Sequence, residues 1–300
     1  MNIGKAIRIH LVDGSVSGIR HAEIVNWTGQ AVSCPRSKIK ALSSWEESKK
    51  PGVYFLFGVD ENSGEDAVYI GEAGNIFNRL QNHIANKDFW NEVVFFTSKD
   101  KNLNARYIKY LESRIVKLTK LCGRDVVLNG NDPQLPESSR SDRDAIDEFL
   151  ANLKILLGVL GHKTLECIYQ RKTNTNPEQE SHTSEEENTD VLDLFLKVKG
   201  INAQAHLTDE GIVVLATSRT SREVKDSLSA GYKRIREQLI QNGTLDKTSN
   251  GYVFTKNQLF KSPSQAAAII VGYSINGRHN WQTKNGITLK SIEELNAKSN

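Results

Sequence analysis

Short apolar runs separated by polar turns dominate the beginning of the chain. Three β-rich runs lie within residues 1–48, where the pairs Asp13 and Gly14, and Thr28 and Gly29, interrupt them. Turn residues between short runs of alternating character are typical of antiparallel strands. The pattern predicts a β-rich N-terminal segment folded as a meander.

Two further apolar runs, GVYFLFGV at 52–59 and AVYI at 67–70, flank the polar segment DENSGED and predict a hairpin. An amphipathic stretch at 75–86 predicts a helix, EVVFFTS at 92–98 predicts a third strand, and 102–121 shows apolar residues at helical spacing. We therefore expect an α+β fold: a small mixed or antiparallel three-stranded sheet flanked by helices.

A change in composition divides the chain after this region. Residues 171–190 have almost no apolar side chain and are rich in Glu, Thr and Asn, which predicts a linker. The preceding region, 49–170, ends in a helix that its serines cap. Residues 191–300 predict a smaller α+β domain, with helices over 221–243 and 262–273.

Composition narrows the class of protein. The chain is 38% hydrophobic and 25% charged, with a formal net charge of +3 and a pI near 8.6, which indicates a globular protein with only a mild positive excess. Apolar runs long enough to cross a membrane are missing. Cys34, Cys122 and Cys167 are far apart and form no CxxC pair, so we expect buried or free thiols in a cytoplasmic protein.

The stretch AVYIGEAGNIFNRLQNH at 67–83 passes from a strand through two glycines into a helix, as phosphate-binding loops do. A Walker loop needs Lys and then Ser or Thr after its second glycine, and a dinucleotide fingerprint needs three glycines. This stretch has neither, and the acidic Glu72 would repel a phosphate from the loop. A nucleotide cradle is therefore disfavoured.

Five side chains around this stretch have both a structural and a functional interpretation. Arg79 and His83 are four apart and share a helix face, which could be a solvated basic face or part of a site. Tyr54 and Tyr69 on the paired strands could be ordinary half-buried aromatics. Glu112 falls inside the apolar face of its helix, where a carboxylate needs a cation, a metal or strong hydrogen bonds.

The order of these residues resembles the GIY-YIG nuclease family, with Val53 in place of the family's isoleucine. The resemblance covers residues 50–132. It rests on GVY at 52–54, YIG at 69–71, Arg79, His83, Glu112 and Asn129. The segment SPSQAAAIIVGYSINGRHNW also resembles a small domain of unknown function that often follows such modules in bacterial proteins.

The resemblance implies a metal-dependent endonuclease that hydrolyses phosphodiester bonds of DNA. Glu112 would hold one Mg²⁺ or Mn²⁺ ion, and Tyr54, Tyr69 and His83 would activate water. Arg79 would stabilise the transition state, and Asn129 would fix the site by hydrogen bonding.

Gly52 and Gly71 would shape turns in the same module. The enlarged loop between the two triplets, and Glu72 where some relatives have Lys, are departures from the family pattern.

Double-stranded DNA is the expected partner, with no membrane contact, and one active site per chain favours nicking or a transient homodimer. Side chains that suit a phosphate backbone or a stacked base are Trp27, Arg36, Lys38, Lys101 and Arg106. A core tryptophan and solvated helix faces explain the same residues structurally. Two other functions stay open: a catalytically silent nucleic-acid-binding module, and a regulatory protein whose C-terminal domain carries the activity.

Overall fold

The protein divides into two compact units, Met1–Cys167 and Ile168–Asn300. The computed structural model describes residues 4–131, 133–136, 139–167 and 192–298. The predicted linker at 171–190 lies outside the described residues. Within the described ranges, no helix is both long and apolar enough to span a bilayer.

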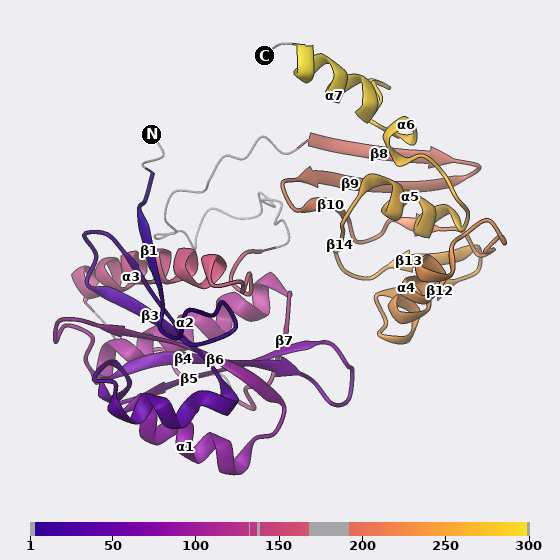
Figure 1. Ribbon diagram of the computed structural model, residues 1–300. Coiled ribbons are helices and arrows are strands. Elements are labelled where there is room, and N and C mark those ends of the chain that lie inside the picture. The colour runs from indigo at the N-terminus through magenta and orange to yellow at the C-terminus, as the bar shows by residue number, and fades with distance from the viewer. Residues whose placement is uncertain (1–3, 132, 137–138, 168–191, 299–300) are drawn as a thin grey trace. The chain divides into compact units, whose positions relative to one another are not determined.

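A seven-stranded sheet forms the centre of the first unit (Figure 1), in the order β1-β2-β3-β6-β4-β5-β7. Its strands are β1 (Ile7–Leu11), β2 (Arg20–Ile24), β3 (Gly29–Pro35), β4 (Gly52–Val59), β5 (Asp66–Ala73), β6 (Trp90–Ser98) and β7 (Val126–Val127). All neighbours are antiparallel except β5 and β7. The mixed α+β class is thus observed, and the expected hairpin of β4 and β5 is confirmed.

The expected three-stranded sheet was too small, because the N-terminal meander joins it. Strand β3 pairs with β6 along its whole length, from Gly29 opposite Ser98 to Pro35 opposite Glu92. Six of the seven residues of β3 are buried, so the strand has apolar surface on both faces and a central place in the sheet suits it. Strands β1, β2 and β3 therefore belong to the same sheet as the strands that follow.

Helices cover both faces of this sheet. Figure 1 shows α2 (Ala105–Cys122) and α3 (Arg140–Val159) on one face and α1 (Ile76–Asn86) on the other. The short 3-10 helices η1 (Arg36–Ser44) and η2 (Glu47–Lys49) contact α1. The side chains of Asn75, Asn104 and Ser139 cap the N-termini of α1, α2 and α3 by accepting hydrogen bonds from backbone N–H groups in the first turn.

Strand β4 contributes side chains to the hydrophobic cores on both faces of the sheet, since successive residues of a strand point to opposite faces. Val53, Phe55 and Phe57 pack with α2 and α3. Tyr54 and Leu56 pack on the side of α1. This alternation places Tyr54 under the helix that carries Arg79 and His83.

A disulfide joins Cys122, at the end of α2, to Cys167, so the expectation of free thiols was wrong for this pair. The chain after α3 returns to the end of α2, where the Nε of Arg124 donates to the carbonyl of Glu166. The two cysteines are 45 residues apart in sequence, and no local motif indicates that they meet. Cys34 is a free, buried cysteine as expected.

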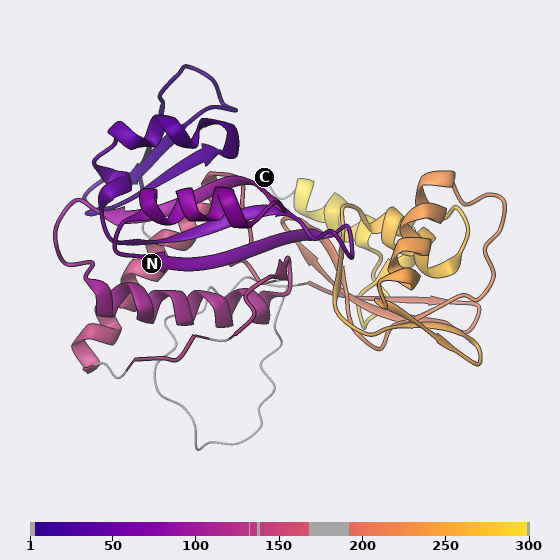
Figure 2. The ribbon, with the colours of Figure 1, turned by 90° about the horizontal axis from the view of Figure 1, so that it is seen from below.

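The second unit contains a five-stranded sheet, ordered β14-β10-β9-β8-β15, and a three-stranded sheet, ordered β11-β13-β12. The strands are β8 (Leu192–Val198), β9 (Ile201–Thr208), β10 (Gly211–Val214), β11 (Arg219–Thr220), β12 (Leu245–Thr248), β13 (Gly251–Phe254), β14 (Gln258–Phe260) and β15 (Trp281–Gln282). The helices are α4 (Ala230–Gln241), α5 (Pro263–Val271), α6 (Gly277–Asn280) and α7 (Leu289–Lys298). In Figure 2 these helices lie together on one side of the strands.

Two local differences separate this unit from its prediction. Helix α4 begins at Ala230, because Ser229 accepts a hydrogen bond from the N–H of Tyr232 and caps the helix there. The observed helix is therefore shorter than the predicted one, which began at residue 221. Strand β9 was not expected. Helix α5 begins at Pro263 with Ser262 as its cap, which confirms the start of the helix predicted over 262–273.

Candidate active site

Tyr54 and Gly71 are cross-strand partners in β4 and β5. A Cβ atom at residue 71 would lie 2.2 Å from the Tyr54 hydroxyl, so the absence of a side chain makes room for the ring. At Gly52, a Cβ would lie 2.2 Å from the carbonyl oxygen of Phe96 in β6. Both glycines therefore lie inside strands and permit close packing. The prediction that they shape turns was wrong.

The Tyr54 hydroxyl is the centre of a hydrogen-bonded group. Its oxygen lies 2.7 Å from Nε2 of His83 and accepts a hydrogen bond from Nε of Arg79 at 3.2 Å. Arg79 and His83 lie one turn apart on α1, on the face that covers the sheet. Tyr54 is fully buried and His83 is 5% exposed, whereas Arg79 reaches solvent. The group thus links a buried phenol to an exposed guanidinium.

The protonation states of this group follow from burial. Burial raises the pKa of Tyr54, and the charge of Glu112 contributes to the increase. Burial, together with the positive charges of Arg79 and Lys87, lowers the pKa of His83 to about 4. The imidazole is therefore neutral at pH 7, and its Nε2 can accept a hydrogen bond from the Tyr54 hydroxyl.

Tyr69 lies beside this group and is held by a residue that sequence reasoning missed. Its ring centroid is 5.4 Å from that of His83 and 6.4 Å from that of Tyr54. The ammonium of Lys87 lies 4.1 Å from the centre of the Tyr69 ring, a cation–π contact. The signal for Lys87 was available, because Arg79, His83 and Lys87 follow each other at intervals of four residues, with Lys87 at the C-cap of α1.

Glu112 lies half-buried on α2, on the opposite side of the sheet from α1. Burial and the nearby charge of Glu72 raise its pKa to about 7, while a hydrogen bond from the Glu72 backbone and the charge of Arg79 act in the other direction. Arg79 interacts electrostatically with both Glu112 and Tyr54. The charge of Arg79 therefore lowers the pKa of both groups.

The chemistry of Glu112 fits a hard divalent cation. It is an oxygen donor whose charge is poorly compensated: among the described residues it forms no ion pair. A cation would relieve the repulsion from Glu72. The described ranges contain no group of three or more His, Cys, Asp and Glu side chains that could hold a metal, so any ion would be bound by this carboxylate and mostly by water, a mode Mg²⁺ commonly adopts.

Asn129 fastens the strand that carries Tyr69 and Gly71. Its Oδ1 accepts from the N–H of Ile70 at 3.0 Å and its Nδ2 donates to the carbonyl of Ile70 at 2.7 Å. The side chain thereby continues the parallel pairing of β7 with β5 beyond the end of β7. Asn129 therefore influences the site indirectly, by holding the backbone of Ile70 between Tyr69 and Gly71.

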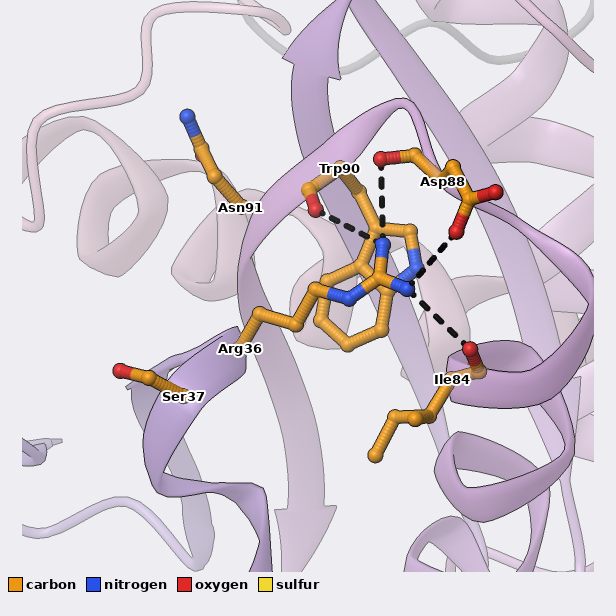
Figure 3. Close-up of a pocket in the computed structure, with 6 residues that line it drawn as sticks. All are labelled: Arg36, Ser37, Ile84, Asp88, Trp90 and Asn91. Carbon is orange, nitrogen blue, oxygen red and sulfur yellow. Dashed lines mark hydrogen bonds and ion pairs between the residues drawn. The ribbon is translucent and has the colours of Figure 1, made fainter.

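Arg36, a predicted nucleic-acid contact, is engaged inside the protein. Figure 3 shows its guanidinium over the Trp90 ring, 4.8 Å from the centroid, with hydrogen bonds to the carbonyls of Ile84, Asp88 and Trp90. A further bond reaches the carbonyl of Lys87 at 2.8 Å. These carbonyls lie at and beyond the last turn of α1, where a cation is favourable. Arg36 therefore stabilises the end of α1 and its connection to β6.

The other predicted contacts divide into two sets. Trp27 packs on Phe149 of α3 with ring centroids 4.8 Å apart, and Lys38 forms an ion pair with Asp13. These two side chains therefore make contacts within the first unit. Lys101 and Arg106 are exposed near the start of α2 and stay predicted contacts.

Comparison with known proteins gives one match. Residues 194–293 match the family described as "Domain of unknown function (DUF4357)". The match falls in the second unit, where the sequence indicates a domain of unknown function. No curated protein and no solved structure matches the chain significantly.

Proposed function

We propose that the first unit is a Mg²⁺-dependent DNA endonuclease of the GIY-YIG type. One observation carries the proposal: a buried tyrosine is hydrogen-bonded to both a neutral histidine and an exposed arginine, and that arginine interacts electrostatically with a poorly compensated carboxylate. An isolated basic helix face would not need Tyr54, His83 and Glu112 in these positions.

Tyr54 and His83 supply a route for the proton of the attacking water. A phenol whose pKa is raised is a poor base by itself. The neutral Nε2 of His83, 2.7 Å away, accepts the Tyr54 proton as the phenolic oxygen takes one from water. The pair thus acts as a relay in which no free phenolate has to form.

Arg79 and Lys87 supply positive charge for the phosphate. Arg79 bonds Tyr54 through Nε, and its side chain is exposed to solvent. A guanidinium suits the fork of phosphate oxygens and becomes more stabilising as their charge grows in the transition state. Lys87, at the C-cap of α1, contacts the ring of Tyr69 and adds a second positive charge.

Glu112 is the residue that would hold the cation. A divalent ion supplies Lewis-acid stabilisation of the phosphoryl oxygens and of the leaving oxygen. Glu112 offers it a hard oxygen ligand, and the neighbouring charge of Glu72 makes neutralisation by a cation favourable.

The proposal is tested by incubating the full chain with supercoiled plasmid in Mg²⁺ and in EDTA. We expect nicking or linearisation only with Mg²⁺, and its loss in Glu112→Gln. The control is Glu148→Gln, which alters an exposed glutamate on α3. Equal cleavage by wild type and Glu112→Gln would reject the proposed metal site. Salt-sensitive DNA binding without cleavage would favour a silent binding module.

A further inference from the structure

Two lysines of the second unit converge on one tyrosine. The ammonium of Lys225 lies 5.2 Å from the centre of the Tyr273 ring, and that of Lys199 lies 6.0 Å from it. The three residues come from separate segments: the turn between β8 and β9, the segment before α4, and the chain after α5. Like charges repel, so their approach to one ring needs a reason.

Lys199 occupies a backbone position that lysine disfavours. It and Gly200 form the two-residue turn between β8 and β9, where Val198 pairs with Ile201. Their φ angles are 48° and 82°. A turn with positive φ at both positions favours Asn, Asp or Gly, and a residue with a longer side chain pays a steric cost there. The strained backbone of Lys199 does not improve the pairing of β8 with β9. Its persistence therefore suggests that the lysine side chain has a function.

Lys225 is fixed at its position by close backbone packing. Its N–H donates to the carbonyl of Gly272 at 2.8 Å, directly before Tyr273. Gly272 has φ 80°, and a Cβ there would lie 2.1 Å from the carbonyl oxygen of Glu223. Because this contact requires glycine, the backbone of the 223–225 segment lies tightly against the end of α5. The Lys225 ammonium is thereby brought to Tyr273.

Within the part of the chain that the structure describes, neither Lys199 nor Lys225 forms an ion pair within 4.0 Å. The described part of this unit is basic: over residues 192–298, Lys and Arg outnumber Asp and Glu by six, whereas the excess over the whole chain is three. Positive charge is therefore concentrated in residues 192–298.

We propose that Lys199 and Lys225, positioned by Tyr273, form a contact site for the phosphodiester backbone of a nucleic acid. An aromatic ring holds an ammonium in place and leaves its N–H donors available, so phosphate oxygens can bind without competition from a protein carboxylate. Two fixed positive charges on a basic surface suit a polyanion with regularly spaced charges. This site needs no catalytic step and stands independently of the proposed nuclease activity.

Binding of labelled DNA to the full chain in EDTA tests the site, because cleavage is then excluded. The probes are a single strand and a duplex of one sequence, and a single-stranded RNA of that sequence as a third arm, each titrated over a range of KCl. The test variant is Lys199→Asn combined with Lys225→Gln. The control is Lys284→Gln, which changes an exposed turn lysine of the same unit.

We expect the double variant to weaken binding about tenfold at low salt and to lower the slope of log affinity against log salt by about 1 to 2, the value for two lost phosphate contacts. The control should match wild type. Lys199→Asn alone should melt at or above the wild-type temperature, because Asn suits the turn. A purely structural lysine would instead lower the melting temperature and leave binding unchanged.

Unchanged affinity and salt slope in the folded double variant would overturn this inference. The result is separable from the fate of the nuclease proposal. Loss of Mg²⁺-dependent cleavage in Glu112→Gln leaves DNA binding in EDTA intact, and the lysine variants weaken binding whether or not the chain cleaves DNA.

Discussion

Gly71 lies directly opposite Tyr54 on the neighbouring strand, and the Tyr54 hydroxyl occupies the space that a side chain at residue 71 would need. Since the same hydroxyl contacts His83 and Arg79, the position of the ring determines the geometry of the whole group. The glycine is a requirement of the site and not of a turn.

Gly71→Ala should displace the Tyr54 ring. Overpacking of this kind costs about 1–3 kcal/mol of stability, and we expect cleavage to fall by at least about tenfold because the hydrogen bonds to Oη are misplaced. Gly74→Ala is the matched control, since a Cβ there meets nothing within 4 Å. Denaturant unfolding and plasmid cleavage measure the two effects. Equal behaviour of the two variants would refute the packing role.

Asn129→Asp should loosen β5 without removing any group that contacts substrate. The acceptor for the Ile70 N–H is kept, but a carboxylate oxygen then faces the Ile70 carbonyl in place of the amide donor. An unsatisfied, repelled carbonyl costs about 1–3 kcal/mol. We expect kcat to fall more than KM changes, because Tyr69 and Gly71 shift.

The control for this change is Asn131→Asp, which alters an exposed residue just beyond the same turn. An Asn129→Asp protein with wild-type stability and kcat would show that the two hydrogen bonds do not position the site.

His83 should make folding stability depend on pH. Its pKa is about 4 in the folded protein and 6.5 in the reference state, so the unfolded chain binds a proton more readily. The stability contributed by the neutral imidazole is complete above pH 6.5 and is lost as pH falls toward 4. The loss should be about 2–3 kcal/mol.

Comparing wild type with His83→Gln at each pH isolates this contribution from that of Glu112, whose raised pKa acts in the opposite sense between pH 4.5 and about 7. His10→Gln, on an exposed position of β1, should keep the wild-type slope. If His83→Gln also kept the wild-type dependence of stability on pH, the His83 imidazole would not be held neutral by burial.

The disulfide should contribute to the stability of the first unit. Closing a loop of this length constrains the unfolded chain by up to about 4 kcal/mol in the chain-entropy account. We expect Cys167→Ser, or a reducing agent added to wild type, to lower the melting temperature. Reducing agent should leave Cys167→Ser unchanged. A wild-type melting curve that is insensitive to the reductant would argue against the bond.

Local patterns predicted the elements around the site well, because capping residues and periodicity act over a few positions. The start of α5 at Ser262 and Pro263, the hairpin of β4 and β5, and the helical face shared by Arg79 and His83 are of this kind. Contacts between distant segments were missed. Neither the pairing of β3 with β6 nor the meeting of Cys122 with Cys167 leaves a local signal.

Three of the predicted DNA contacts, Trp27, Arg36 and Lys38, are engaged inside the protein, and composition could not indicate this. A basic residue in a sequence can serve a substrate or the protein's own carbonyls, and composition does not distinguish them. Arg36 binds the carbonyls at the end of α1, and only the packing of that helix against β6 and η1 creates the demand for a cation there. Lys87 was overlooked because its partner, the Tyr69 ring, comes from another element.

The most direct measurement is the rate of Mg²⁺-dependent plasmid nicking by Tyr54→Phe under single-turnover conditions. This substitution keeps the ring over Gly71 and removes only the oxygen that bonds His83 and Arg79. If the hydroxyl relays the proton of the attacking water, the rate should fall by about 100-fold or more while DNA binding in EDTA stays at the wild-type level. A Tyr54→Phe protein that nicks DNA as fast as wild type would contradict the proposed active site.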